Sequence, residues 1–337
     1  MNDDYLWEGR GQPEADVKRL EEGLSEFRVA PQPLAIPDEE FEKLRQRGGF
    51  SGAWWRWPRL VLGAGALAVV ALATGLWLSH RVGSEQPSWA VARLEGTPRV
   101  GATAVTENGR FAVGQWLETD AESRARIDVG DIGEVVVGPN SRLRLTDARA
   151  KRKQLYLEHG AMTARITAPP WLFYVDTPAA TAVDLGCEYT LEADEKGNGL
   201  LRVTLGWVQL FDGTRQVMLP ADSAAKMRRG FGPGTPYFED TSAEFQRALE
   251  ELDFGTQSSP ERAAALSTVL SEARKKDALS LFPLLIHVQD EERGRVYDRL
   301  AELIPPPAGV TREGVLQHDR REIDLWWDNW GLGHPKK

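Results

Sequence analysis

The stretch from Phe173 to Leu191 reads FYVDTPAATAVDLGCEYTL and decides the fold of the region around it. Phe173-Tyr174-Val175 alternates in polarity, a period of two that is typical of a strand with one buried face. Leu185-Gly186-Cys187-Glu188-Tyr189 reads as the start of another strand. Cys187 is the single cysteine of the 337 residues, so it forms no internal disulfide, and we expect its side chain to be buried and unreactive.

Similar alternating runs extend on both sides of this stretch, from about Trp89 to Met227, and recur roughly every 8–12 residues. The further runs lie at 125–129, 134–137, 143–145, 154–157, 163–166, 201–205 and 209–211. Turn residues such as Gly138-Pro139-Asn140 and Asp212-Gly213 separate them, and we place His159-Gly160 in a β-turn as well. The pattern predicts an all-β sandwich, barrel or solenoid, and the strand period alone does not separate these three folds.

Several of these stretches, taken in order, resemble the FecR domain. The fullest match is 173–191, where the family typically has Gly-Thr-x-Phe and this chain has Gly186-Cys187-Glu188-Tyr189. The other matching stretches are 113–117, 123–127, 138–143 and 157–162. The resemblance covers roughly residues 89–210, and its specificity comes from the order and spacing of the pieces, since each piece alone is weak.

The resemblance implies a transmembrane regulator with a β-solenoid-like domain outside the cytoplasm. In FecR-like regulators, a cytoplasmic N-terminal segment binds an extracytoplasmic-function sigma factor and the outer domain receives a signal. We therefore predict a periplasmic, all-β, solenoid-like domain at 88–230. Leu6-Trp7-Glu8-Gly9 and the helix after it sit where the sigma-binding part would be. We do not recognise the additional C-terminal domain through which such regulators contact an outer-membrane transporter.

An uncharged segment from Leu60 to Leu78, LVLGAGALAVVALATGLWL, precedes the β region. As a helix it spans roughly 28 Å, close to the ~30 Å hydrocarbon core of a bilayer, and it predicts a transmembrane helix at 60–79. Basic residues cluster before it, with Arg56 and Arg59 nearest. Because the positive flank stays in the cytoplasm, we expect a single-pass protein of the bacterial inner membrane, with the N-terminus inside and the C-terminal domains periplasmic.

Residues 1–59 form the predicted cytoplasmic segment. It carries an apolar stripe at helical spacing, made of Val17, Leu20, Leu24 and Phe27, followed by a proline-rich linker at 31–37. A segment this small buries such a stripe poorly by itself. The stripe therefore either binds a cytoplasmic partner, with a sigma factor as the candidate, or belongs to a weakly ordered tail beside the membrane.

After residues 230–236 the spacing of apolar residues changes from that of strands to that of helices, and we predict an α-helical domain at 238–337. The expected helices lie at 240–254, 260–276, 278–288, 290–303 and 312–330. Helices joined by short turns indicate a small HEAT-like array, although no fixed repeat is visible. Near its end, Trp326, Trp327 and Trp330 are either anchors for an interaction partner or a cap that packs on the helices.

Composition and motifs argue against several functions. The net charge of −9 does not favour direct nucleic-acid binding. A single cysteine and five scattered histidines supply no zinc motif, and no nucleophile or phosphate-binding motif is present, so we expect no enzyme, cofactor or metal site.

Two hypotheses remain. The first is a membrane-anchored signalling regulator whose outer domain senses or binds a periplasmic partner and whose cytoplasmic segment controls a sigma factor. The alternative is an envelope interaction scaffold that binds a protein or a cell-wall polymer, with the N-terminal segment serving only as an anchor.

Overall fold

The computed structural model of the chain describes residues 87–256 and 260–331. All of them belong to one compact unit, Val82–Lys337. The predicted transmembrane helix at 60–79 and the predicted cytoplasmic segment lie outside the described residues. No helix within the described ranges is long and apolar enough to cross a membrane.

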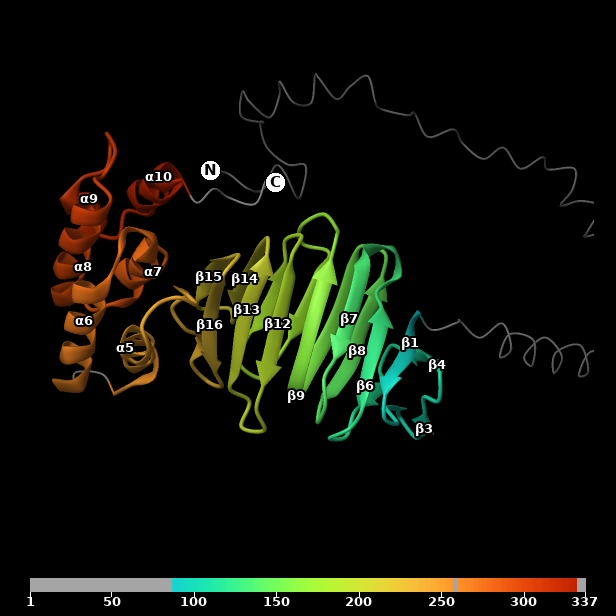
Figure 1. Cartoon of the computed structure of the whole chain (residues 1–337). Coiled ribbons are helices and arrows are strands. Elements are labelled where there is room, and N and C mark those ends of the chain that lie inside the picture. The colour runs from blue at the N-terminus through green and yellow to red at the C-terminus, as the bar shows by residue number, and fades with distance from the viewer. Residues whose placement is uncertain (1–86, 257–259, 332–337) are drawn as a thin grey trace, which may run out of the picture. The chain divides into compact units, whose positions relative to one another are not determined.

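The strands form two sheets that share one long strand, β9 (Figure 1). The first sheet has the order β4 (Asn108–Ala112), β1 (Ser88–Glu95), β6 (Arg124–Asp128), β7 (Gly133–Val137), β9 (Arg152–Ile166), β12 (Glu188–Ala193), β13 (Gly199–Leu205) and β16 (Ser223–Arg228), with β17 (Gly232–Pro233) and β18 (Tyr237–Phe238) on β16. The second has the order β3 (Thr103–Ala104), β2 (Arg99–Val100), β5 (Trp116–Glu118), β8 (Arg142–Arg149), β9, β10 (Phe173–Asp176), β11 (Thr181–Asp184), β14 (Trp207–Phe211) and β15 (Gln216–Pro220). Among the strands in the described part of the chain, every pairing is antiparallel except that of β9 with β10.

The shared strand corrects one prediction. We expected two strands separated by a β-turn at His159-Gly160, but β9 runs unbroken for 15 residues. Its first half pairs with β8 and β10 in the second sheet, and its second half pairs with β7 and β12 in the first. Gly160 has φ +100°, so a glycine bend carries the strand from one sheet to the other without ending its pairing.

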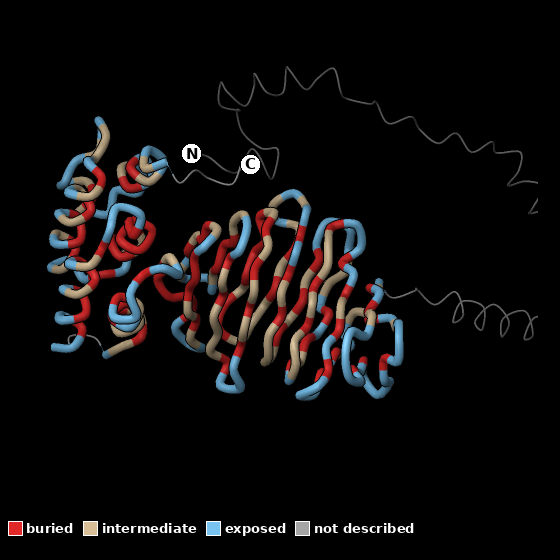
Figure 2. The backbone as a smooth tube through the Cα atoms, in the orientation of Figure 1, coloured by how far each residue is buried: buried red, intermediate tan, exposed pale blue. Residues whose placement is uncertain are grey.

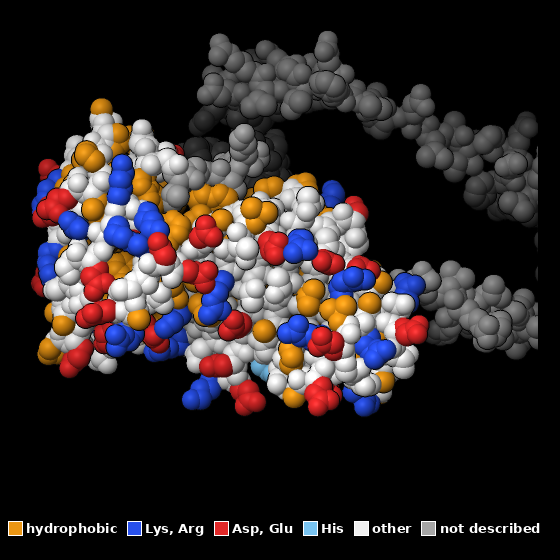
Figure 3. Space-filling view, in the orientation of Figure 1, with side chains coloured by type: hydrophobic (Ala, Val, Ile, Leu, Met, Phe, Trp, Pro, Cys, Tyr) orange, Lys and Arg blue, Asp and Glu red, His pale blue; other side chains and the backbone are white. Residues whose placement is uncertain are grey.

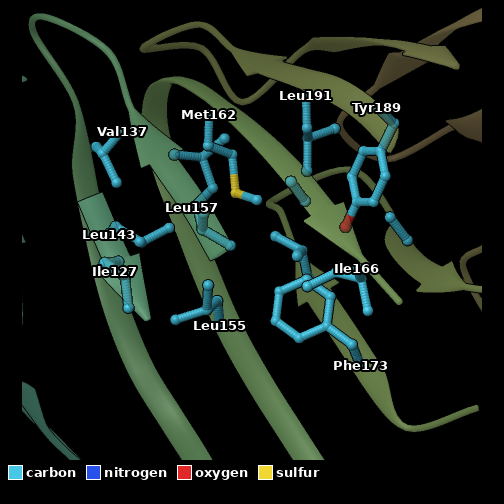
Figure 4. Packing of buried hydrophobic residues seen from close by; sticks show 14 of the residues in the cluster. Ile127, Val137, Leu143, Leu155, Leu157, Met162, Ile166, Phe173, Tyr189 and Leu191 are labelled. Atoms are coloured by element: carbon cyan, nitrogen blue, oxygen red, sulfur yellow. The ribbon is translucent and has the colours of Figure 1, made fainter. Parts of the chain in front are cut away.

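One apolar core fills the space between the two sheets. Inward-facing residues from both sheets belong to the same buried cluster, for example Ile127 and Met162 from the first sheet and Leu155 and Phe173 from the second (Figure 4). Buried and less buried residues alternate along the strands (Figure 2), as the sequence pattern requires. The described strands form a two-sheet sandwich and not a closed barrel, and the solenoid-like repeat stays a prediction.

Six α-helices follow the sheets within the described residues. They are α5 (Ala243–Phe254), α6 (Pro260–Glu272), α7 (Ala278–His287), α8 (Asp290–Leu303), α9 (Arg312–Leu316) and α10 (Arg320–Trp330). The helix that we expected at 312–330 is two helices, because His318 adopts φ +61° and Asp319 caps the new N-terminus by accepting a hydrogen bond from the Arg321 amide. The HEAT-like character of the array stays a prediction.

Arg293 ties three of these helices together. Its side chain is 3% exposed and donates hydrogen bonds to the carbonyl oxygens of Leu285 (2.8 Å), Val288 (3.1 Å) and Leu316 (3.1 Å). Asp290 accepts a further bond at 2.7 Å. These carbonyls end α7 and α9, so the guanidinium satisfies acceptors that have no partner within their own helices.

The helices pack directly on the sandwich. Arg215, just before β15, forms an ion pair with Asp253 of α5 at 2.8 Å, and both side chains are largely buried. Ala224 of β16 belongs to the same apolar cluster as the helices. The residues predicted as a β domain and as a helical domain are therefore joined by a shared contact surface.

Candidate functional site

The tryptophans near the C-terminus divide between the core and the surface of the helical region. Trp326 is fully buried and packs edge-on against Phe282 (5.6 Å between ring centroids) and Tyr297 (5.3 Å). Trp327 and Trp330 are half-buried and lie 5.3 Å and 5.8 Å from the Phe282 ring. Of the three predicted anchors, Trp327 and Trp330 thus retain surface through which a partner can make contact.

Trp327 lines a groove between β15, α7 and α10, which we call the β15 groove. Its first part has a volume of about 210 Å³ and is mainly apolar. This part is lined by Gln216, Val217, Met218, Phe282, Pro283, Ile286, His287, Ile323, Asp324 and Trp327. In Figure 1, β15 lies at the side of the sandwich that faces the helices. Sheet and helices together build this groove, so strand or helix periodicity alone does not reveal it.

The second part of the β15 groove is larger and polar. It has a volume of about 520 Å³ and shares Gln216, Ile286, His287 and Asp324 with the first part, so the two are continuous. Arg215 and Arg320 add positive charge to its wall. The pKa of His287 falls to about 4 because the pocket desolvates the ring and the two arginines repel its protonated form, so His287 is neutral near pH 7.

A buried polar cluster lies elsewhere in the sandwich, around Asp184. This side chain is 2% exposed, and its carboxylate accepts hydrogen bonds from the Gly186 amide (2.7 Å) and the Cys187 thiol (2.7 Å). Burial raises the pKa of Asp184 to about 6. The Cys187 thiol is buried, and its pKa lies well above the ordinary range because of burial and the neighbouring carboxylate, which agrees with an unreactive cysteine.

The outer surfaces of both sheets carry ion pairs between neighbouring strands, which on the second sheet join Arg142 to Glu118 and Glu158. The first sheet carries ion pairs between neighbouring strands, such as Arg165–Glu188 at 3.0 Å and Arg202–Glu192 at 2.6 Å, and Figure 3 shows acidic and basic side chains mixed on the face in view. The second sheet carries a row in register, Trp116, Arg144, Tyr156, Asp176, Thr181, Phe211 and Gln216. The mixed charges on both sheets form solvated surfaces. The row on the second sheet also contains Trp116, Tyr156 and Phe211, so we call it the aromatic row, and its rings offer a surface for contact with another molecule.

The remaining predicted site residues, Val17, Leu20, Leu24 and Phe27, lie outside the described residues. Within the described ranges, no three His, Cys, Asp or Glu side chains gather closely enough to hold a metal ion. The groove residues Arg215, Met218, Ile286 and Arg320 were not predicted as site residues from the sequence.

Comparisons with known proteins found similar solved structures and a matching family model. Two crystal structures of a proposed anti-sigma factor from Parabacteroides distasonis, at 1.65 Å and 2.50 Å resolution, each match with 16% sequence identity and a TM-score of 0.33. Each match covers 40% of this chain and 64% of the solved chain. No curated protein matches the sequence. The model of the FecR protein family matches residues 115–214, from just before β5 to the turn after β14. The chain therefore carries a FecR-family domain.

Proposed function

We propose that this protein is a membrane-anchored signalling regulator. Its FecR-family domain and helices face the periplasm and bind a partner or envelope ligand there, and its cytoplasmic segment controls an extracytoplasmic-function sigma factor. The observation that carries the proposal is the FecR match at 115–214, which follows an uncharged 19-residue stretch with a basic flank. A regulator of this kind needs a part on each side of the membrane, and this order of segments supports such an arrangement.

An envelope scaffold is the second candidate. The aromatic row on the second sheet supports this candidate. The ring centroids of Trp116 and Tyr156 lie 6.1 Å apart, and the Cζ atom of Arg142 lies 4.1 Å from the Trp116 ring centroid. Aromatic and arginine side chains are enriched where proteins bind other molecules. The scaffold needs no cytoplasmic partner, so loss of the stripe residues has no consequence in that case.

The membrane topology is directly testable because Cys187 is buried and unreactive. In otherwise native protein we expect Glu107→Cys to react with a membrane-impermeant maleimide in cells whose outer membrane alone is permeabilised. Ser25→Cys should react only after the inner membrane is lysed. The unmodified protein serves as the control and should stay unlabelled. Labelling of Ser25→Cys before lysis, or protection of Glu107→Cys until lysis, would contradict the proposed orientation.

A further inference from the structure

One edge of the second sheet has no strand partner among the described residues. β15 pairs only with β14. At their turn the Asp212 amide bonds to the Arg215 carbonyl at 3.2 Å, so this facing pair is a hydrogen-bonded one. Hydrogen-bonded and non-hydrogen-bonded pairs alternate along an antiparallel ladder. The N–H and C=O groups of Gln216 and Met218 therefore point away from β14, toward the open edge.

The β15 groove runs beside this open edge. Met218 lines its apolar part and Gln216 lines both parts, so the apolar part and the charged part lie about two strand positions apart. A strand added to β15 directs alternate side chains to the same face, and residues i and i+2 are separated by roughly 6.6–6.8 Å. Two side chains of an added strand would thus reach the two parts of the groove together.

The charges in the groove favour an acidic side chain in its polar part. Arg320 is exposed there and takes part in none of the ion pairs found in the described ranges. Arg215 also lines this part, although its charge is balanced by Asp253. Asp324 is the one carboxylate among the lining residues and forms no ion pair with Arg320. A carboxylate of a ligand placed between Arg320 and His287 would form an ion pair with Arg320 and accept a hydrogen bond from His287. Both interactions would lie in the partly desolvated polar part of the groove.

We propose that the β15 groove binds an extended peptide segment of a protein partner, which adds a strand to β15. The segment carries one bulky apolar side chain, seated between Met218, Ile286 and Trp327, and one acidic side chain two positions away, paired with Arg320. The sheet edge supplies affinity through main-chain hydrogen bonds, and the two parts of the groove supply selectivity. This inference goes beyond sigma-factor control and does not depend on the cytoplasmic segment.

The test is a selection of displayed random ten-residue peptides on the full chain in detergent micelles. We expect enrichment of sequences with a bulky apolar and an acidic residue two positions apart. A selected peptide should bind Arg320→Glu at least roughly tenfold more weakly, because the favourable charge pair becomes a repulsive one. Arg321→Glu is the matched control, since Arg321 is exposed on the same helix but does not line the groove, and it should bind as the native chain does.

Backbone pairing is tested on the peptide side, which leaves the protein unchanged. N-methylation of one alternate set of residues should abolish binding, whereas methylation of the other set should leave it within about twofold, because only one set faces β15. The proposal would be overturned if methylation of either set weakened binding equally, or if a selected peptide bound Arg320→Glu as tightly as the native chain.

If peptides bind only a chain shortened after Gly331, the chain's own last residues occupy the groove. If no chain enriches peptides, the groove does not take a strand; both results also overturn the proposal.

Discussion

Replacing Gly160 by alanine is expected to destabilise the sandwich by about 3 kcal/mol or more, which is a large fraction of the roughly 5–15 kcal/mol by which folded domains are stable. A Cβ at this position would lie 2.4 Å from the Cα and 2.2 Å from the Oγ of Ser141. Ser141 is 1% exposed, and its hydroxyl accepts a hydrogen bond from the Ala161 amide at 2.9 Å, so it has no room to move. The φ of +100° adds backbone strain for any residue with a Cβ.

Gly114→Ala is the matched control for this substitution. Gly114 also has a positive φ, +91°, but a Cβ there would meet no atom within 4 Å. We expect it to cost only about 1–2 kcal/mol from the backbone conformation. Urea unfolding of a fragment beginning at Val82 measures both variants. Equal stabilities of Gly160→Ala and Gly114→Ala would show that β9 does not cross between the sheets as described.

Asp184→Asn is expected to remove a pH dependence of about 3 kcal/mol from the stability of the sandwich. The folded carboxyl holds its proton up to about pH 6, whereas the ordinary value is 3.8. Between these values the folded state binds more protons than the unfolded state, so this group's contribution to stability falls as the pH rises through the window. Above about pH 6 the contribution is flat, because the carboxyl is then ionised in both states.

The measurement is the free energy of unfolding of the native and Asp184→Asn fragments at pH values from 4 to 8. The native fragment should lose stability relative to the variant from about pH 4 to 6, since a shift of about two pH units corresponds to about 3 kcal/mol. Asp128→Asn, which removes an exposed carboxyl at the end of β6, is the matched control for the loss of a carboxyl. If the difference between the native and Asp184→Asn curves does not change with pH, folding does not raise the pKa of Asp184, and the prediction is contradicted.

Much of the sandwich could be predicted because one face of each strand is buried. The run predicted at 134–137 is the strand Gly133–Val137, and the run at 209–211 lies in Trp207–Phe211. The sequence analysis did not predict that 154–157 and 163–166 join into one strand. It assigned Gly160 to a turn, whereas an isolated glycine within a strand pattern can also mark a bulge. The unbroken pairing of β9 and the close approach of Ser141 distinguish this bend from a turn, and both come from tertiary structure.

The candidate site was harder to predict than the fold. Trp327 was singled out by composition, but the groove it lines also needs Met218 and Ile286, which lie more than 60 residues apart in the sequence. β15 has an exposed edge because it is the last strand of its sheet. The alternation of apolar and polar residues does not determine the order of strands in a sheet. A sequence of this kind therefore indicates which faces are buried, while the sites between elements emerge only from the packing.

We propose that residues 1–59, the predicted cytoplasmic segment of this protein, bind a sigma factor, and co-purification from native cells tests this proposal most directly. The full chain is compared with a Leu20→Asp, Leu24→Asp double variant and with a Lys18→Ala, Glu22→Ala control on the polar side of the same predicted helix. We predict that a sigma factor accompanies the native chain and the control, and is lost from the double variant. A sigma factor retained by all three, or found with none, would contradict the account.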